Sequence, residues 1–592
     1  MIFPMARQPD MGEGTTMFGV NYNPNIAYFS MEIGIDADIP TYSGGLGVLA
    51  GDTLKSCADF GLPLVGVTLM YHKGYFRQEI NAAGEQVEHP VDWKPEIKLK
   101  LLPKKIILRE IEGRDIFVQA WLYCYKGATG KEVPVLFLDT NLEGNSEEDR
   151  RLCESLYGGD REHRLKQEIL LGIGGVKYLR ALGFNQIHTF HMNEGHSALL
   201  TLELLRESQR TIFETWDEDT VWNFAKVRGL CVFTTHTPVA AGHDTFPYPL
   251  VEKILKTGIS SKVIKNICGE SMLNMTTLGL NLSRFANGVA KAHGDVSRDM
   301  FPKYAIDFIT NGIHVPTWTH QPFKELFDMY AELWHKDPKY LRKAEAIPCE
   351  EIWRAHQQCK AELFDEINRL TSCKWNLDVF TIGFARRSAT YKRATLLFTD
   401  LDRLISIAEK SPGIQLVFSG KAHPQDEPGK ANIKRIHEYK KQIESRTDKL
   451  KLIYLPDYNM RLGFLITAGV DLWMNTPLRP QEASGTSGMK CTVNGVLNFS
   501  ILDGWWVEGC IEGITGWAIG DLNPHTEKSL DELANFDSKN LYDKLEEKIV
   551  PEFYQNRGRW VEMLRHNIAL NASFFNTHRQ MEQYVSKAYY NG

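Results

Sequence analysis

Several signals that would assign this chain to a simple class are missing from its sequence. Its ten cysteines are scattered and form no Cys-x-x-Cys pair, which argues against a zinc ribbon or a disulfide framework. No apolar run reaches the length of a transmembrane helix, and the first residues hold no apolar core of a signal peptide. We also find no internal repeat and no low-complexity segment. We therefore expect a cytoplasmic globular protein with reduced, buried thiols and no membrane attachment.

An excess of positive charge is missing as well. Lys and Arg number 68 and Asp and Glu number 74, so the formal net charge is −6, whereas nucleic-acid-binding domains are generally basic. Hydrophobic residues make up 43% of the 592 residues. That content supports large packed cores, and the length supports two to four domains.

The histidines form no recognisable metal motif. Residues 187–196 and 232–243 contain five of them, without a His-Glu-x-x-His pattern or a neighbouring cysteine pair. We therefore predict no metal site. Both stretches are typical of the ends of buried strands, where polar groups face a crevice. His196 and His236 are candidates for such groups, and the alternative for each is a hydrogen-bonded core histidine.

The most informative stretch is the loop at 482–490, which reads Glu-Ala-Ser-Gly-Thr-Ser-Gly-Met-Lys. Its small side chains let backbone N–H groups approach an anion, and the hydroxyls of Thr486 and Ser487 add donors. A nucleotide P-loop is excluded by spacing, because that motif needs a Gly-Lys pair. Two interpretations of Lys490 remain. It is a solvated surface lysine, or it lies in an apolar setting, has a depressed pKa and binds pyridoxal phosphate through its amine.

Two further segments offer groups that bind anions. Residues 42–52 place a Gly-Gly-Leu-Gly turn between a predicted strand at 26–32 and a predicted helix, which favours an anion site at the helix N-terminus. Residues 386–393 read Arg-Arg-Ser-Ala-Thr-Tyr-Lys-Arg and follow a predicted strand at 379–385. Arginine presents a bidentate fork to phosphate and lysine a point charge. Taken alone, the first is equally a tight turn and the second a solvated charge run.

Together these segments resemble the α-glucan phosphorylases, the family of the glycogen, starch and maltodextrin phosphorylases. The loop at 482–490, with Asn494-Gly495 and Asp503-Gly504 after it, is similar to the cofactor segment of that family. Longer members commonly read Gly-Thr-Gly-Asn-Met-Lys where this chain reads Gly-Thr-Ser-Gly-Met-Lys, so it resembles the short prokaryotic form. The resemblance runs from about residue 26 to the end. It implies retaining, reversible phosphorolysis of α-1,4-glucan to glucose 1-phosphate, with pyridoxal phosphate as cofactor and its 5′-phosphate as proton relay.

The resemblance also implies roles for individual residues. At the reacting phosphate and the cleavage point, the resemblance implies roles for Arg387, Lys392, Gly45 and His236. In binding the cofactor, it implies roles for Lys490, Arg386, Thr486, Ser487 and Tyr458. In binding the glucan, it implies roles for Glu482, Ser484, Gly485, Asn311, His196, Gly44 and Leu46.

Two details depart from the long phosphorylases. Residues 434–441 read Lys-Arg-Ile-His-Glu-Tyr-Lys-Lys, nearly the phosphate motif of the long form, but in the family that motif precedes a Gly-Lys-Ala segment, found here at 420–422. Only the cluster at 386–393 precedes it, so we predict that Arg387, not Arg435, binds the phosphate and that 434–441 is a solvated helix. The long form also has an arginine where this chain has Asn459, and Arg461 is the candidate replacement for its charge.

Alternating strands and helices predict an α/β fold. The resemblance specifies it as two Rossmann-like doubly wound domains facing across a cleft, the GT-B glycosyltransferase architecture. We expect a lead-in over 1–25, an N-terminal glucan-binding domain over 26–318 and a helical connection over 319–375. A C-terminal pyridoxal-phosphate domain follows over 376–555, and helices over 556–592 cross back to the N-terminal domain.

The expected partners are α-1,4-glucan, inorganic phosphate and glucose 1-phosphate, with no nucleic acid; homo-oligomer formation stays open. One alternative function is a nucleotide-sugar glycogen or starch synthase of the same fold, which has no use for a cofactor lysine. Another is an inactive glucan-binding protein, which would not need Arg387, Lys392 and Lys490 together.

Overall fold

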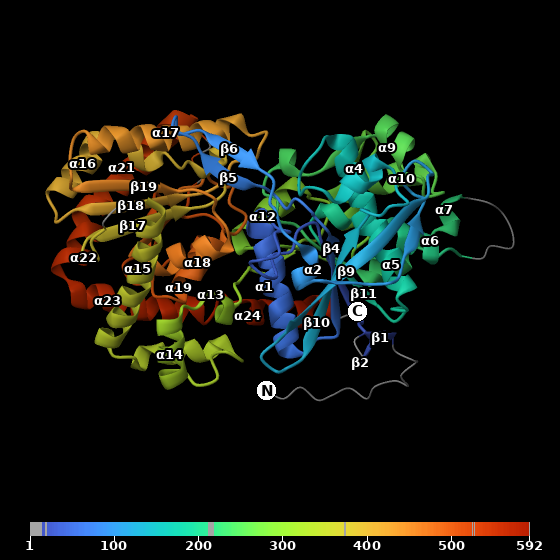
Figure 1. Cartoon of the computed structure of the whole chain (residues 1–592), viewed down its shortest axis with the longest axis horizontal. Coiled ribbons are helices and arrows are strands. Elements are labelled where there is room, and N and C mark those ends of the chain that lie inside the picture. Colours follow the sequence, from blue (N-terminus) through green and yellow to red (C-terminus); the bar gives the residue numbers. More distant parts are fainter. Residues whose placement is uncertain are drawn as a thin grey trace.

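The computed structural model describes residues 15–590, apart from 18–19, 211–217, 372–374, 524 and 526. Most of the predicted lead-in, residues 1–14 and 18–19, therefore lies outside the described residues. Two short strands of it, β1 (Thr15–Met17) and β2 (Val20–Tyr22), pair in antiparallel fashion. Two large sheets organise the rest, and Figure 1 shows them side by side with their helices.

The first sheet has ten strands and is mostly parallel. Its order is β16-β15-β12-β11-β3-β4-β10-β9-β7, with β8 pairing β9. All neighbours from β16 to β10 are parallel, and β9 is antiparallel to β10, β7 and β8. The bounds are β3 (Ile26–Ser30), β4 (Leu64–Leu69), β7 (Lys100–Leu101), β8 (Ile106–Leu108), β9 (Ile116–Lys126), β10 (Glu132–Asp139), β11 (Thr189–Asn193), β12 (Cys231–Thr234), β15 (Phe285–Gly288) and β16 (Asp307–Phe308). Parallel strands buried on both faces carry continuous apolar runs, which is why β3, β4 and β10 were predictable from the sequence.

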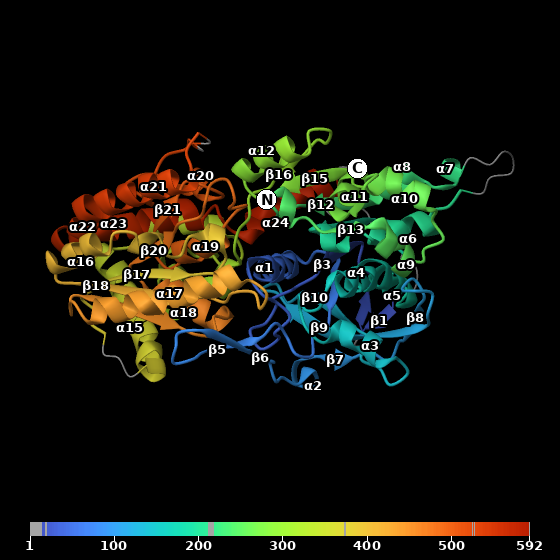
Figure 2. The ribbon, with the colours of Figure 1, turned by 90° about the horizontal axis from the view of Figure 1, so that it is seen from above.

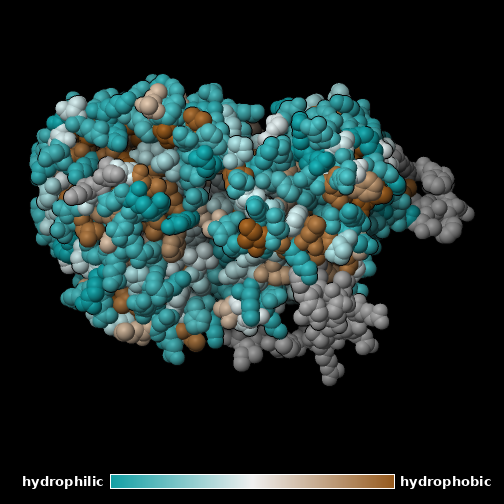
Figure 3. Space-filling model, in the orientation of Figure 1, coloured by the Kyte–Doolittle hydropathy of each residue, from teal (hydrophilic) through white to brown (hydrophobic). Residues whose placement is uncertain are grey.

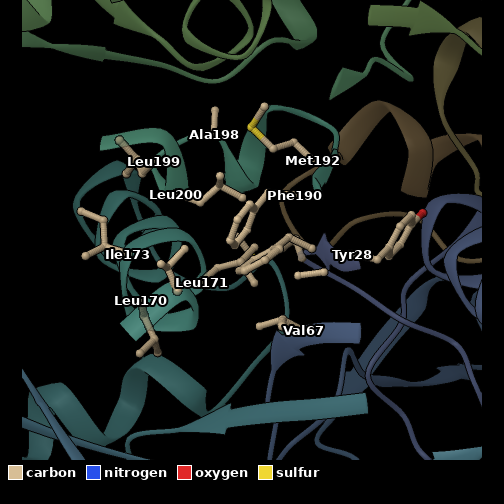
Figure 4. Packing of buried hydrophobic residues seen from close by; sticks show 14 of the residues in the cluster. Tyr28, Val67, Leu170, Leu171, Ile173, Phe190, Met192, Ala198, Leu199 and Leu200 are labelled. Carbon is tan, nitrogen blue, oxygen red and sulfur yellow. The ribbon is translucent and has the colours of Figure 1, made fainter. Parts of the chain in front are cut away.

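Helices cover the first sheet. They include α1 (Gly45–Phe60), α4 (Arg161–Ile169), the π turn η2 (Leu170–Gly174), α5 (Gly175–Ala181), α6 (Leu200–Glu207), α8 (Phe224–Leu230), α9 (Tyr248–Ile254), α10 (Ser261–Cys268), α11 (Met275–Asn281), α12 (Lys291–Met300) and α13 (Val315–Trp318). α4, η2 and α5 follow one another without interruption. Figure 4 shows Leu171 of η2 on the side of Phe190 of β11, in the apolar cluster to which both belong. Gly175 of α5 lets this helix approach β3 closely, because a Cβ there would lie 2.6 Å from the ring of Phe29.

The second sheet has six strands, all parallel, in the order β19-β18-β17-β20-β21-β22. The bounds are β17 (Phe380–Ala385), β18 (Ile414–Ser419), β19 (Leu450–Leu455), β20 (Leu472–Asn475), β21 (Leu497–Ile501) and β22 (Gly516–Ile519). The strand predicted at 379–385 is confirmed as β17. The accompanying helices are α14 (Gln321–Tyr330), α15 (Cys349–Thr371), α16 (Leu401–Glu409), α17 (Glu427–Glu444), α18 (Met460–Gly469), α19 (Thr486–Thr492), α20 (Trp506–Gly509), α21 (Leu530–Lys544), α22 (Val550–Gln555), α23 (Arg557–Asn567) and α24 (Thr577–Tyr584).

A hairpin that the sequence analysis did not predict joins the two halves. Its strands, β5 (Arg77–Ile80) and β6 (Gln86–His89), lie beside α17 in both ribbon views (Figures 1 and 2). The side-chain amide of Gln78 donates to the Gly420 carbonyl at 2.8 Å, and that of Gln86 donates to the Ala422 carbonyl at 2.9 Å. These bonds hold the loop after β18 against the first half of the chain.

The C-terminal helices also connect the halves. Trp560 and Leu564 of α23 belong to the apolar cluster of the second sheet, whereas Met581 and Tyr584 of α24 belong to that of the first. The Tyr584 hydroxyl lies 3.0 Å from the Thr234 hydroxyl at the end of β12. The C-terminal segment therefore passes from the second sheet to the first between α23 and α24.

The surface in Figure 3 is largely hydrophilic, with scattered apolar patches. Across the described ranges no helix is both long enough and apolar enough to cross a membrane. The nine cysteines that the structure describes are all free thiols.

Candidate active site

A pocket of about 970 Å³ is lined by loops from both halves of the chain. Most of these loops follow the carboxyl ends of parallel strands, the edge at which α/β sheets bind ligands. Thus Glu194 follows β11, His236 follows β12, Arg387 follows β17 and Lys421 follows β18.

All sixteen residues that the sequence analysis proposed for the site line this pocket. They are Gly44, Gly45, Leu46, His196, His236, Asn311, Arg386, Arg387, Lys392, Tyr458, Glu482, Ser484, Gly485, Thr486, Ser487 and Lys490. The structure brings them together, and their individual roles stay predictions.

Lys490 is buried in α19, and only 6% of it is exposed. Its Nζ lies 3.7 Å from the centre of the Trp318 ring, an arrangement that stabilises an ammonium through the ring face. Burial nevertheless lowers the pKa of Lys490 to about 8, because the charged form loses its hydration. The interpretation of Lys490 as a solvated surface residue is therefore wrong. A large neutral fraction near pH 8 makes its amine a better nucleophile.

Two hydrogen bonds fix the loop before α19 to residues 503–505. Gly485 has φ 87°, a left-handed conformation that glycine adopts without strain. The Trp505 N–H donates to the Ser484 carbonyl at 2.9 Å, and the Glu482 N–H donates to the Asp503 carboxylate at 2.9 Å. Burial raises the pKa of Asp503 to about 7. The Ser484 hydroxyl is buried and has no protein partner, so it remains available to a ligand in the pocket.

The glycine turn before α1 presents open backbone to the same pocket. No atom lies within 4 Å of a Cβ built on Gly44 or Gly45, and α1 begins at Gly45. The Glu32 carboxylate fixes the position of the turn by accepting the Ser43 N–H at 2.6 Å. The predicted arrangement of strand, glycine turn and helix is confirmed. The N-terminus of α1, with its partial positive charge, faces the pocket.

The basic cluster is organised by Glu482. Its Oε2 lies 2.6 Å from the Lys392 ammonium and also pairs with the Arg386 guanidinium. Burial by itself raises the pKa of Glu482, but the two cations outweigh it and lower the pKa to about 2. Glu482 is therefore ionised at any physiological pH.

Arg387 differs from Arg386 and Lys392. Its side chain is exposed in the pocket, and within the described ranges no carboxylate lies at ion-pair distance from it. Its guanidinium fork is therefore available to an anion that enters the pocket.

The structure places both segments in which this chain differs from the long phosphorylases, residues 434–441 and residues 459–461. Arg435 is exposed on α17 and does not line the pocket, so the solvated helix over 434–441 is confirmed. Arg461 is also exposed and does not line the pocket, so its position does not support it as the replacement for the missing charge. Asn459 does line the pocket, and its side chain caps α18 by accepting the Leu462 N–H at 3.0 Å.

The sequence analysis did not single out Glu194. Its backbone has φ 78° and ψ 165°, a region that residues other than glycine rarely adopt and that concentrates at functional sites. Its carboxylate accepts the His236 N–H at 2.7 Å, the Thr237 hydroxyl at 2.9 Å and the Gly195 N–H at 2.9 Å. Glu194 thus positions the loop that carries His236. The one signal in the sequence was a charged residue directly after a buried strand.

The two histidines that were proposed for the site, His196 and His236, are neutral. Burial lowers the pKa of both His196 and His236 to about 3. The Nε2 of His236 lies 2.7 Å from the Asn193 side-chain oxygen. Since that oxygen only accepts, Nε2 carries the proton and Nδ1 is the acceptor. These imidazoles act as hydrogen-bonding groups and not as charges.

Known proteins resemble the chain along nearly its whole length. The family model of the carbohydrate phosphorylases matches residues 33–111 and 259–513. The maltodextrin phosphorylase of Thermococcus litoralis is 39% identical over 624 residues, which cover 98% of this chain and 72% of that protein. The glycogen phosphorylase of Mycobacterium tuberculosis is 37% identical over 621 residues, covering 95% and 70%. The glycogen phosphorylase of Aquifex aeolicus is 34% identical over 625 residues, covering 96% and 86%.

Proposed function

The chain belongs to the carbohydrate phosphorylase family, and on that premise we propose that it is a retaining α-1,4-glucan phosphorylase that depends on pyridoxal phosphate. It would release glucose 1-phosphate from the chain ends of glycogen or maltodextrin with inorganic phosphate. One observation carries the proposal, namely that three features share one pocket. These are Lys490 with its lowered pKa, Arg387, which has no carboxylate partner among the described residues, and the open glycine turn of α1. A synthase that uses a nucleotide sugar has no need of this lysine.

The residues around Lys490 fit pyridoxal phosphate. The pKa of Lys490, lowered to about 8, suits covalent attachment through its neutral amine. The Ser484 hydroxyl and the Arg386 Nε–H are buried donors without a protein partner, and buried polar groups in proteins are generally hydrogen-bonded. A phosphate group in the loop at 484–487 would satisfy both. When bound, the cofactor supplies a 5′-phosphate that acts as the proton relay.

The chain's own residues bind and orient the reactants. The glycosidic bond from C1 breaks, a phosphate oxygen bonds to C1, and a proton passes to the leaving oxygen. This transition state carries positive charge at the sugar ring and is stabilised by anions held close to it. Arg387, Lys392 and the Gly45 N–H would hold the phosphate against the repulsion of the cofactor's phosphate.

The sugar is oriented by neutral and anionic acceptors. His236 and Asn311 line the pocket and would bind sugar hydroxyls together with Glu482. Because Glu482 meets both cations through Oε2, its Oε1 is the oxygen that would accept a sugar hydroxyl. Glu194 fixes the position of His236 in this arrangement.

The architecture forms part of the proposal. We assign the two sheets to two Rossmann-like domains facing across the pocket, in the GT-B arrangement, with the boundaries 26–318, 319–375, 376–555 and 556–592 given above. The apolar clusters support this division. One draws on residues between Ile26 and Ile309 and again from Met581, a second chiefly on residues between Ile313 and Phe575, and a smaller third on residues between Leu363 and Val496. A cytoplasmic location is also proposed and rests on the scattered cysteines of the sequence.

An absorbance spectrum of the purified protein, followed by borohydride reduction and peptide mapping, tests the cofactor assignment. We expect about one pyridoxal phosphate per chain, with the label on Lys490. The variant Lys434→Arg serves as the control, because Lys434 is a half-exposed residue of α17 that pairs with Glu85 and does not line the pocket; it should retain both the spectrum and the label. A label on another lysine, or an active enzyme without bound cofactor, would refute the assignment.

A further inference from the structure

A buried cluster of possible metal ligands lies outside the pocket. Asp59, His314 and His578 each offer one ligand atom, and these atoms all lie within 4.8 Å of one another. The three side chains are only 4%, 2% and 3% exposed. Asp59 lies near the C-terminal end of α1, about 20 Å along the helix from Gly45 at the pocket. His314 directly precedes α13, and His578 lies in the first turn of α24.

Both imidazoles direct Nε2 at the same carboxylate oxygen. The Nε2 of His314 lies 2.8 Å and that of His578 lies 3.1 Å from Oδ2 of Asp59. The two rings are stacked, with centroids 5.7 Å apart and planes 18° from parallel. Despite the short distance, Nε2 of His578 is buried without a hydrogen bond of acceptable geometry. A buried nitrogen without a partner is uncommon and calls for a missing proton acceptor or ion.

The far side of each ring faces hydroxyl groups. His314 Nδ1 lies 2.7 Å from the Thr317 hydroxyl, and His578 Nδ1 lies 3.5 Å from the Ser56 hydroxyl. The other oxygen of Asp59 accepts the Ala128 N–H at 2.7 Å. Metal-binding histidines have this arrangement, since an outer hydrogen bond fixes the tautomer and leaves a lone pair directed at the ion.

We propose that Asp59, His314 and His578 bind a divalent transition-metal ion, with zinc as the best fit to the donor set. Two imidazoles and one carboxylate suit zinc and its neighbours, whereas calcium and magnesium prefer oxygen ligands throughout. Three protein ligands leave the fourth tetrahedral position to a water molecule. Binding requires both Nε2 atoms to present a lone pair to the ion, and the Thr317 hydroxyl at 2.7 Å from Nδ1 of His314 can accept the ring proton on the far side.

The site would have a structural role, because its three ligands are sealed from solvent and do not themselves line the pocket. An ion would fasten α24 to α1 and to the start of α13, at a junction where the backbones already touch. A Cβ built on Gly312 would lie 2.2 Å from the Asn576 carbonyl carbon, and Ile313 forms an isolated bridge with Asn576. The same short segment ends at Trp318, on which Lys490 packs. The ion would therefore secure the C-terminal helix against the domain that carries the glycine turn.

The test uses the full-length protein with its cofactor, stripped of metal by a chelator and then titrated with Zn²⁺ or Co²⁺. We expect one ion per chain by elemental analysis, visible Co²⁺ absorption typical of a tetrahedral site, and a rise in Tm on adding Zn²⁺. His314→Gln and His578→Gln should each weaken binding by about a hundredfold or more. His566→Gln, a half-exposed histidine on α23 that pairs with Glu345, is the matched control and should bind normally.

A milder variant covers the case in which the ligand variants fail to fold. Thr317→Val removes only the hydroxyl behind His314, and loss of such an outer partner weakens metal binding by roughly 10- to 100-fold. The proposal is overturned if the wild-type protein binds no stoichiometric ion and its Tm does not respond to Zn²⁺, as expected for a cluster held by protons alone. It is equally overturned if folded Gln variants bind the ion as tightly as the wild type.

Discussion

Replacing Arg387 by lysine keeps a positive charge in the pocket and removes the planar fork that grips a phosphate through two parallel hydrogen bonds. The perturbation is well confined, because no carboxylate within the described ranges pairs with Arg387 and the side chain is exposed in the pocket. Arg386 and Lys392 keep their common partner Glu482. The change therefore removes contacts to the anion and leaves the folded protein intact.

The magnitude follows from the number of bonds that are lost. A hydrogen bond to a charged group contributes about 1.5–3 kcal/mol, and lysine retains about one of the two that the fork makes. Removing a preorganised donor at a reacting anion typically costs about 2.7–4 kcal/mol of transition-state stabilisation. Since each 1.36 kcal/mol is about tenfold in rate, we expect Arg387→Lys to lower kcat/KM for phosphate by about a hundredfold.

Arg435→Lys is the matched control, because Arg435 is exposed on α17 and belongs to the segment that mimics the phosphate motif of the long form. Initial rates of glucose 1-phosphate formation over a range of phosphate concentrations measure both variants, and the cofactor spectrum reports whether Lys490 still holds its ligand. We expect a normal spectrum in both and a normal rate only in Arg435→Lys. A silent Arg387→Lys beside a damaging Arg435→Lys would refute the assignment of the phosphate site.

Three further changes test other parts of the site. Glu194→Gln replaces a charged acceptor of the His236 N–H with a neutral one, so kcat/KM for glucan should fall about tenfold; an unchanged value in initial-rate assays would contradict this positioning role. Because only the neutral amine of Lys490 attacks and its pKa is about 8, covalent incorporation of pyridoxal phosphate into cofactor-free protein should slow about tenfold per pH unit below 8; a rate that does not change from pH 6 to 8 would exclude it. Burial raises the pKa of Asp503 from 3.8 to about 7, so the folded state binds the proton more tightly and wild-type stability should fall, relative to Asp503→Asn, as pH rises from about 4 to 7; a Tm difference independent of pH would rule this out.

The sequence predicted those parts of the protein that short segments specify. β4 is a continuous apolar run, and the loop at 482–490 is a contiguous motif, so both were recognisable without a structure. The residues of the site were named from the resemblance to the phosphorylases, which rests on contiguous motifs of the sequence. All sixteen proposed residues consequently line one pocket.

The features that the sequence could not predict depend on contacts between distant residues. Nothing near Glu482 in the chain indicates that it pairs with Arg386 and Lys392, 96 and 90 residues away. The search for a metal site used the histidines between 188 and 243, whereas the buried cluster joins Asp59 to His314 over 255 residues. Ligand spacing in sequence detects only sites whose ligands are close in the chain. Whether Arg461 replaces the charge missing at Asn459 was likewise left open by the sequence, because it depends on the direction of a helical side chain, which the structure places in solvent.

The central claim, that this protein cleaves α-1,4-glucan with phosphate, is tested most directly by incubating the purified protein with maltodextrin and following glucose 1-phosphate. We predict that glucose 1-phosphate forms only when inorganic phosphate is present, and that glucose 1-phosphate extends the glucan in the reverse direction. Extension of the glucan from ADP-glucose or UDP-glucose, with no glucose 1-phosphate formed from maltodextrin and phosphate, would contradict the account.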